Sequence, residues 1–268
     1  MDFRGIIAIT SRTDKAPEHQ ERQGKKNRIT IIKRRKRRMN VAVILAGGSG
    51  RRVGGDKPKQ FVEVAGKAVI QHTIEAFSQN GRIDEIAIVT REDYVKEVWD
   101  MVRREGYSKV AHVLKGGKER YHSSIAAIEA YTDDDVRLLF HDAVRPLVTQ
   151  RIIDDCIDAL DTCQAVEVAV PATDTIIEVD SEGNISRITP RSRLRNVQTP
   201  QGFRRGVIAE AFRIAMEDKD FAPTDDCSVV FRYMPGIKIK VIEGDTQNIK
   251  ITYKDDLDMA ARVLAGRE

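Results

Sequence analysis

Cysteine and long apolar runs are both scarce in this 268-residue sequence, and each scarcity excludes a class of protein. The 3 cysteines, Cys156, Cys163 and Cys227, are too few and too unevenly spaced for a zinc site or a disulfide framework. Cys156 and Cys163 lie on one predicted helix, which favours packing in the core. No apolar run approaches the roughly 18 residues that span a membrane, so we expect a soluble protein. Because reduced cysteines are typical of the cytoplasm, we expect a cytoplasmic one.

The net positive charge of the chain belongs to its first 38 residues. This segment holds 13 Lys and Arg against 4 Asp and Glu, a net charge of +9, and ends in a basic run at residues 33–38. The remainder carries 45 − 13 = 32 basic and 41 − 4 = 37 acidic side chains, a net charge of −5. Such a run is typical of an arm for nucleic acid or an anionic membrane, or of a targeting extension. We prefer a third interpretation, in which Met39 is the natural start and residues 1–38 are a disordered or non-native extension.

From Met39 onwards, apolar strand patterns alternate with amphipathic helix patterns over one predicted domain, residues 39–268. With 41% hydrophobic residues, the chain is long enough to bury one sizeable core. Alternation of this kind is typical of a Rossmann-like α/β fold, a mostly parallel sheet with helices on both faces. The predicted strands include residues 41–45, 83–89, 110–114 and 137–140, and the predicted helices include residues 69–77, 94–104 and 123–131.

The most informative stretch is a glycine-rich loop at residues 45–52, directly after the first predicted strand and shortly before Pro58-Lys59-Gln60. Its glycines let backbone N–H groups approach phosphate oxygens, and Arg52 and Lys59 add positive charge. The loop lacks the Lys-Ser/Thr of a Walker motif and the third glycine of a dinucleotide fingerprint, where Val53 stands. We therefore predict a loop that wraps a nucleoside triphosphate.

Two further patterns place functional elements. The predicted strand at residues 137–140 delivers Asp142 to the carboxyl edge of the sheet, where ligands bind in open α/β folds. Residues 175–179 and 185–188 are extended patterns around a polar turn, which indicates a β-hairpin. We expect this hairpin to protrude as an arm that covers approximately residues 172–196.

Five motifs in a fixed order carry a resemblance to a known family. They are residues 45–52 with 58–60, 141–146, 174–175, 198–201 and 248–252. From about residue 40 to the C-terminus, the sequence resembles the cytidylyltransferases that act on polyol phosphates. The resemblance implies a nucleotide-diphospho-sugar transferase type of fold, and transfer of a cytidylyl group from CTP to a polyol phosphate with release of pyrophosphate. The family includes enzymes that make CDP-methylerythritol for isoprenoids and enzymes that make CDP-ribitol for teichoic acid or capsule.

This reaction needs no protein nucleophile, because the acceptor phosphate itself attacks the α-phosphorus, and cations with Mg²⁺ neutralise the transition state. By resemblance, Arg52 and Lys59 hold the phosphates of CTP, and Lys250, at a predicted strand end, approaches the α-phosphate from the opposite side. The same resemblance implies a nucleotide site formed by Ala46, Gly47, Gly48, Gly50, Lys118 and Ser123. If the local register differs, Ser124 takes the place of Ser123 in this site.

On the acceptor side, Asp142 offers the hard oxygen ligand that Mg²⁺ prefers and is implied to lie, with Arg145, along the polyol pocket. By resemblance, that pocket is completed by Thr175, Thr199 and Thr224. The arm crosses to a second subunit in this family, so Arg191 is implied to bind the polyol phosphate of the partner's site, and a homodimer is expected. We interpret His141 as structural, because a phosphate nucleophile arrives ionised and needs no base.

The identity of the acceptor is where the sequence leaves alternatives open. Residues 141–155, 165–176 and 224–228 favour the ribitol branch, whereas residues 191–194 favour the methylerythritol branch. We predict D-ribitol 5-phosphate, with 2-C-methyl-D-erythritol 4-phosphate as the alternative. Two other classes stay open: a non-catalytic nucleotide-binding or RNA-binding protein that uses the basic tail, and a sugar-1-phosphate nucleotidyltransferase. The latter shares the first loop but is not expected to carry the later motifs. We expect neither a membrane nor a nucleic-acid partner.

Overall fold

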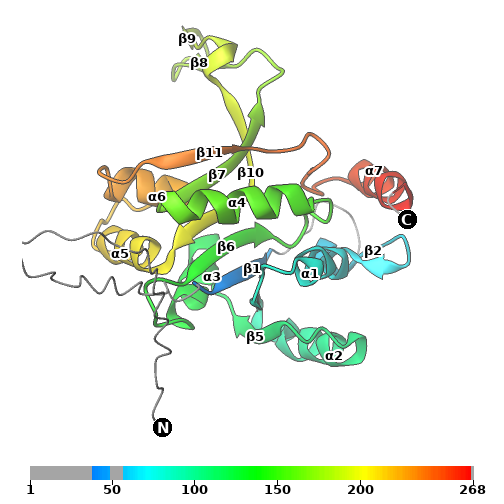
Figure 1. The fold of residues 1–268 in the computed structure, drawn as a ribbon. Helices are drawn as coiled ribbons and strands as arrows, with labels where there is room; N and C mark the ends of the chain where they lie inside the picture. Colours follow the sequence, from blue (N-terminus) through cyan, green and yellow to red (C-terminus); the bar gives the residue numbers. More distant parts are fainter. Residues whose placement is uncertain (1–37, 49–56, 267–268) are drawn as a thin grey trace, which may run out of the picture. The chain divides into compact units, whose positions relative to one another are not determined.

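Seven strands form one central sheet in the computed structural model, which describes residues 38–48 and 57–266 (Figure 1). The strands of this sheet are β1 (Asn40–Ala46), β4 (Glu85–Thr90), β5 (Val110–Lys115), β6 (Arg137–Asp142), β7 (Ala165–Pro171), β10 (Arg195–Arg204) and β11 (Ile239–Glu243). The chain divides into two units, Met1–Lys36 and Arg37–Glu268, and all described residues belong to the second. Nearly all of the predicted extension, together with Gly50 and Arg52, lies outside the described residues.

The strand order is β11-β7-β10-β6-β1-β4-β5. β10 pairs antiparallel with both β6 and β7, and the other neighbouring pairs of this sheet are parallel, which confirms the predicted mostly parallel sheet. From β1 the chain moves outward to β4 and β5 on one side, and β6 lies on its other side. Strands β1 and β6 therefore flank a switch point in strand order, and at their carboxyl ends Leu45 lies opposite Asp142. Ligands of open α/β sheets bind at such a point.

Helices cover both faces of the sheet because successive side chains of a buried strand point to opposite sides. In β1, Ala42 and Ile44 join one apolar cluster, whereas Val41 and Val43 join another. The first cluster contains residues of α1 (Val69–Gln79), α2 (Val95–Glu105) and α4 (Gln150–Thr162). The second contains residues of α3 (Arg120–Glu129), α5 (Arg205–Ala215) and α6 (Asp226–Tyr233). The predicted cover of helices on both faces is confirmed.

The cysteines are free and two of them pack in the core, as expected. Cys156 is buried in α4 and Cys227 in α6. The prediction that Cys163 also lies on a helix is wrong, because α4 ends at Thr162 and Cys163 follows it in an extended conformation. Among the residues that the structure describes, no helix has the length and the hydropathy needed to cross a membrane.

Short elements and one late helix surround the carboxyl ends of β1 and β6. They are η2 (Lys59–Phe61), β2 (Glu63–Val64), β3 (Lys67–Ala68), η3 (Glu92–Tyr94) and α7 (Lys254–Ala265). α7 contributes to a third apolar cluster that also contains Val144 and Leu147, from the loop after β6, and Ile251. The C-terminal part of the chain is thereby packed against the loop that follows Asp142.

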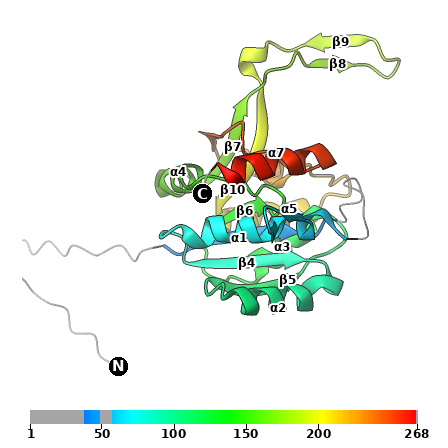
Figure 2. The same ribbon diagram turned by 90° about the vertical axis from the view of Figure 1, so that its right-hand side faces the viewer.

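The predicted hairpin is confirmed as β8 (Ile177–Val179) and β9 (Ile185–Ile188), which pair antiparallel and stand away from the central sheet (Figures 1 and 2). The Asp180 carboxylate accepts the backbone N–H groups of Glu182 and Asn184, each at 2.9 Å, and closes the turn. The strands of this arm expose a row of apolar side chains: Ile177, Val179, Ile185 and Ile188.

Candidate active site

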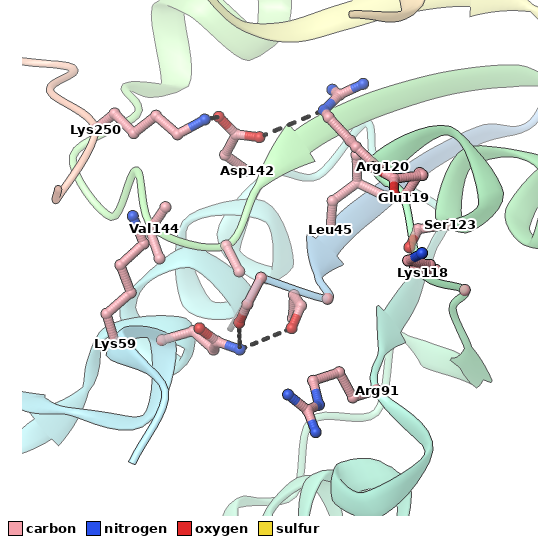
Figure 3. A pocket seen from close by; sticks show the side chains of 16 residues that line it. Leu45, Lys59, Arg91, Lys118, Glu119, Arg120, Ser123, Asp142, Val144 and Lys250 are labelled. Atoms are coloured by element: carbon pink, nitrogen blue, oxygen red, sulfur yellow. Dashed lines mark hydrogen bonds and ion pairs between the residues drawn. The ribbon is translucent and has the colours of Figure 1, made fainter. Parts of the chain in front are cut away.

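A cavity of about 670 Å³ lies at the carboxyl ends of β1 and β6 (Figure 3). The ends of these strands with the loops that follow them, the 3-10 turn η2, and the start of α3 with the loop before it supply most of its wall. The described residues that line it are Leu45, Ala46, Gly47, Gly48, Lys59, Gln60, Arg91, Gly117, Lys118, Glu119, Arg120, Ser123, Asp142, Ala143, Val144 and Lys250. The cavity therefore occupies the place where the strand order predicts a ligand.

The wall of this cavity carries an excess of positive charge. Its described part comprises five cationic side chains against two carboxylates: Lys59, Arg91, Lys118, Arg120 and Lys250 against Glu119 and Asp142. Low-dielectric walls with one predominant sign of charge concentrate ligands of the opposite sign. The chemistry of the cavity thus suits a polyanion such as a nucleoside triphosphate.

The described part of the glycine-rich loop is fixed to the cavity wall by Gln60. The Gln60 side chain donates from Nε2 to the carbonyl oxygens of Ala46 (2.8 Å) and Gly48 (3.1 Å). These two carbonyls are thereby occupied, while Gly47 and Gly48 line the cavity. The predicted Pro58-Lys59-Gln60 motif and the predicted loop are neighbours in space, and Gln60 has a holding function that the sequence analysis did not assign.

A second loop, after β5, brings the start of α3 against the first. α3 begins at Arg120, three residues earlier than predicted, because the His122 ring accepts the Glu119 N–H at 3.1 Å and caps the helix start. A Cβ atom on Gly117 would lie 2.5 Å from the His122 Cβ atom, so this close approach requires glycine. Lys118 and Ser123 line the cavity, as expected of nucleotide-binding residues. The alternative residue, Ser124, is fully buried and is absent from the described lining.

Lys59 joins two distant parts of the chain at the cavity. Lys59 as a whole residue is only 8% exposed, and its Nζ donates to the Ile251 carbonyl at 2.7 Å. The Ile251 N–H in turn donates to the carbonyl of Val144, in the loop after β6, at 2.9 Å. The segment that contains Lys250 is therefore held against the same wall as Lys59.

The placement of Lys250 corrects one prediction. Residues 248–252 do not lie at a strand end, because β11 ends at Glu243 and the chain continues as an irregular segment. Two buried neighbours hold this segment in place: Asn248 donates from Nδ2 to the Thr199 carbonyl at 2.9 Å, and Ile251 packs with α7. The predicted motif thus supplies anchors on both sides of Lys250, whose ammonium lies 2.9 Å from Asp142 Oδ2.

Asp142 is the electrostatic centre of the cavity. Burial alone disfavours its charged form, but three cations outweigh burial and hold the pKa of Asp142 well below its ordinary value. Lys250 lies 2.9 Å, Arg145 3.4 Å and Arg120 4.0 Å from the carboxylate oxygens. In Figure 3, Lys250 and Arg120 approach Asp142 from opposite sides. Asp142 is therefore an ionised acceptor of hydrogen bonds at neutral pH.

A chain of hydrogen bonds fixes Asp142 from behind. The Asp142 N–H donates to Thr199 Oγ1 at 3.2 Å, and that hydroxyl lies 3.0 Å from His141 Nδ1. His141 Nε2 lies 3.0 Å from the Arg145 carbonyl, which only accepts, so Nε2 carries the proton and Nδ1 accepts from Thr199. Burial lowers the pKa of the fully buried His141 to about 4. His141 is therefore neutral and has a structural role, in agreement with the prediction.

Several predicted acceptor residues lie away from the cavity wall. Thr199 is only 5% exposed, and its hydroxyl is hydrogen-bonded to Asp142 and His141 in the interior. Arg145 donates to the Asp142 carboxylate and to the Asn248 carbonyl. Thr175 and Arg191 are exposed on the arm, where Arg191 Nη1 donates to the Thr173 carbonyl at 2.8 Å. Within the described residues, the cavity lining includes none of the following: Arg145, Thr175, Arg191, Thr199 and Thr224. Their roles in acceptor binding stay predictions.

An α/β fold with a cationic cavity at this switch point has the form of a nucleotide-binding protein. Residues 40–266 match the family described as "IspD: 2-C-methyl-D-erythritol 4-phosphate cytidylyltransferase", and the chain belongs to this family. The protein is therefore a nucleotidyltransferase that transfers a cytidylyl group from CTP to a polyol phosphate. The predicted family, reaction class and fold are confirmed.

Individual relatives carry two different names. The chain is 39% identical over 231 residues to "2-C-methyl-D-erythritol 4-phosphate cytidylyltransferase" of Thermobifida fusca, with 84% of this chain and 92% of the relative covered. It is also 39% identical over 231 residues to "Bifunctional ribulose 5-phosphate reductase/CDP-ribitol pyrophosphorylase Bcs1" of Haemophilus influenzae, with 85% and 48% covered. Among solved structures, the 4-diphosphocytidyl-2C-methyl-D-erythritol synthase of Anaerococcus prevotii superposes with a TM-score of 0.76 at 28% identity, covering 85% of this chain and 99% of that one.

These names do not confirm the predicted preference for ribitol 5-phosphate. The family description, the Thermobifida relative and a Bifidobacterium longum relative at 40% identity over 230 residues all name methylerythritol phosphate. The alternative acceptor of the sequence analysis thus fits the comparisons better than the preferred one.

Proposed function

We propose that the protein converts CTP and 2-C-methyl-D-erythritol 4-phosphate to the CDP-methylerythritol product and pyrophosphate. The observation that carries this proposal is the family match over residues 40–266, whose description names this acceptor. A phosphate oxygen of the acceptor forms a bond to the α-phosphorus of CTP, and the bond from that phosphorus to the pyrophosphate oxygen breaks. No side chain has to form a covalent intermediate or remove a proton.

In this proposal the catalytic effect comes from positioning and from positive charge. Lys59 and Lys250 line the cavity from opposite ends of the chain and neutralise charge on the triphosphate as the α-phosphorus becomes five-coordinate. Arg52, outside the described residues, has the same proposed role on the loop that follows Gly48. The Lys250 side chain is 45% exposed, so its ammonium has room to move from Asp142 to a phosphate oxygen.

Asp142 is proposed to bind the acceptor when Lys250 turns to the triphosphate. Its carboxylate stays ionised because Arg120 and Arg145 still face it. An ionised carboxylate accepts hydrogen bonds from the hydroxyl groups of a polyol. Arg145, Thr199 and Thr224 support or complete this side of the site.

Magnesium is a proposed cofactor, and the side chains fit it in one restricted way. Among the described residues there is no group of three or more His, Cys, Asp or Glu side chains that could hold a metal by themselves. Mg²⁺ in nucleotide sites is usually bound by one or two carboxylates together with phosphate oxygens and water, and Asp142 supplies one such oxygen ligand on the cavity wall. The ion would there add positive charge against the triphosphate.

The arm is proposed to serve a second copy of the chain. Its strands expose Ile177, Val179, Ile185 and Ile188, which is costly for a hairpin that packs against nothing. Arg191 and Thr175 lie at its base and do not line the described wall of their own cavity. A homodimer in which each arm lends Arg191 to the partner's site accounts for both observations.

D-Ribitol 5-phosphate is a second candidate acceptor. The Haemophilus relative, which is named a CDP-ribitol pyrophosphorylase, is as similar to this chain as the Thermobifida relative. The chain spans only 48% of that bifunctional protein, so the similarity concerns a part of it.

The test is pyrophosphate release by the full chain with CTP and Mg²⁺, run in parallel with the two acceptors. We expect a higher kcat/KM with 2-C-methyl-D-erythritol 4-phosphate. A higher value with D-ribitol 5-phosphate would transfer the proposal to the second candidate, and no release with either would contradict the acceptor assignment. A reaction with UTP in place of CTP is the control for the nucleotide.

A further inference from the structure

Arg120 lies between two carboxylates that are far apart in the sequence. Its Nη1 atom is 2.6 Å from Asp226 Oδ2, and its Nε atom is 4.0 Å from Asp142 Oδ1. Arg120 is the first residue of α3, Asp142 the last residue of β6, and Asp226 the first residue of α6. One guanidinium thus connects the start of α3, which carries the predicted nucleotide residue Ser123, with β6 and α6, which carry or follow the proposed acceptor residues Asp142 and Thr224. The comparisons and the sequence motifs assign it no role.

The pair with Asp226 fixes the guanidinium in place. Asp226 is 1% exposed, and its second oxygen, Oδ1, is buried without a hydrogen-bond partner in the described structure. A buried carboxylate whose cation is removed is strongly destabilised. Arg120 is therefore not available to swing onto a phosphate group, unlike the more exposed Lys250.

The segment before α6 has other supports that make Arg120 one of several anchors. The Gln201 side chain accepts the Asp226 N–H at 3.1 Å and donates to Asp225 Oδ2 at 2.8 Å. Asp225 Oδ1 accepts the Ser228 N–H at 2.7 Å and caps α6. Gln201 therefore holds this segment to the sheet, and Arg120 holds it to the cavity. Thr224, which directly precedes it, is one of the proposed acceptor residues.

The opposite side of the guanidinium faces Asp142. In the proposed reaction Lys250 leaves this carboxylate for the triphosphate, and the remaining cations are Arg120 and Arg145. Arg145 lies in the loop that directly follows Asp142, whereas Arg120 belongs to another element, α3. The orientation of Asp142 relative to the 224–226 segment is thus set by Arg120.

We propose that Arg120 is a positioning residue for the acceptor, which holds Asp142 and the Thr224–Asp226 segment at the separation that a polyol phosphate requires. This inference rests on the proposed function, since it assigns Asp142 and Thr224 to the acceptor. Arg120 acts through these groups and makes no transition-state contact itself. A planar guanidinium with several donors can address both carboxylates, which the single ammonium of lysine cannot do equally well.

The test compares the full-length variants Arg120→Met and Arg120→Lys with wild type in pyrophosphate release. CTP is varied at saturating acceptor and the acceptor at saturating CTP, with whichever of the two polyol phosphates wild type uses. We expect Arg120→Met to raise the acceptor KM by about tenfold or more, with the KM for CTP changed less than about threefold. The acceptor KM of Arg120→Lys should lie between the values of wild type and Arg120→Met.

The control is Arg205→Met, which removes an ion pair of the same 2.6 Å length, with Asp134, remote from the cavity lining. We expect it to leave both KM values unchanged. An equal or larger increase in the KM for CTP, or no change in either KM, in Arg120→Met would overturn the proposal. If Arg120→Met does not fold, Asp226→Asn is measured instead, which keeps the shape and weakens the pair, and the same two outcomes apply. Wild-type preference for ribitol 5-phosphate would contradict the proposed acceptor but leave this test intact.

Discussion

The substitution Thr199→Val distinguishes a structural role of this hydroxyl from a role in acceptor binding. Valine has nearly the shape of threonine but carries no hydroxyl group. In the structure, Thr199 Oγ1 accepts the Asp142 N–H at 3.2 Å and donates to His141 Nδ1 at 3.0 Å. Since both partners are buried, the substitution leaves one donor and one acceptor in the interior without a partner.

The expected loss of stability follows from these two groups. A buried polar group that loses its partner costs about 1–3 kcal/mol, so the two together cost about 2–6 kcal/mol. For a domain of this size, each kcal/mol lowers the melting temperature by roughly 2–4 °C, which gives a decrease of at least about 4 °C. The carboxylate of Asp142 is expected to shift as its backbone loses support, so turnover should fall as well.

The assay is thermal and urea denaturation, each followed by circular dichroism, with pyrophosphate release on the same preparations. Thr199→Ser is the matched control, because it keeps the hydroxyl and removes only a methyl group, and we expect it to stay close to wild type in both measurements. If Thr199→Val is as stable as wild type and only its acceptor KM rises, the hydroxyl serves the acceptor and the chain of hydrogen bonds described here is refuted.

The other predictions concern charge. Lys59→Ala and Lys250→Ala should each lower kcat by at least about tenfold in pyrophosphate release while the circular dichroism spectrum is retained, and normal turnover in either would contradict the role proposed for these cations. Arg191→Ala should raise the acceptor KM and leave that for CTP unchanged. A mixture of the Arg191→Ala and Lys59→Ala proteins should be more active than the mean of the two separate proteins. In a mixed dimer the arm of the Lys59→Ala chain, which keeps Arg191, completes the cavity of the Arg191→Ala chain, which keeps Lys59. No gain in activity on mixing would count against the shared site. Burial raises the pKa of Glu167 to about 7, so Glu167 lowers stability as the pH rises from its ordinary value of 4.5 to 7. Burial lowers the pKa of His141 to about 4, so the contribution of His141 to stability increases as the pH rises from 4 to its ordinary pKa of 6.5. In wild type this increase masks the decrease that comes from Glu167. Glu167→Gln removes the decrease from Glu167 and keeps the increase from His141. The free energy of unfolding of this variant, measured by urea denaturation, should therefore rise by about 3 kcal/mol relative to wild type between pH 4.5 and 8. An equal pH dependence in the two proteins would refute this role of Glu167.

The features that the sequence predicted correctly are those with local signals. The apolar run of β1 before the glycine turn and the polar turn of the arm depend on residues that are neighbours in the chain, as the Asp180 contacts show. The resemblance implies Lys59, Ser123 and Asp142 as site residues, and all three line the cavity, while their roles in binding and catalysis stay predictions.

The features that the sequence did not reveal depend on pairs far apart in the chain. Arg120 and Asp226 are 106 residues apart, and Lys59 and Ile251 are 192 residues apart, so no spacing rule connects them. The place of β10 between β6 and β7 depends on long-range strand pairing in the same way. Because Thr199 lies on β10, its position behind Asp142 rather than on the cavity wall could be recognised only from the assembled sheet.

The position of β6 has a consequence for how such an enzyme changes its acceptor in evolution. In the proposed assignment, the residues for CTP on β1, η2 and α3 precede β6 and those for the acceptor begin with its last residue, Asp142. Two residues cross this division, because Lys250 follows β6 and acts on the triphosphate, and Arg120 precedes β6 and positions the acceptor. β6 is buried along its whole length, with β1 on one side and β10 on the other. A gene crossover within β6 would therefore combine one parent's Arg120 with the other parent's Asp142, Asp226 and Lys250, so an exchange of the acceptor part has to preserve these ion pairs.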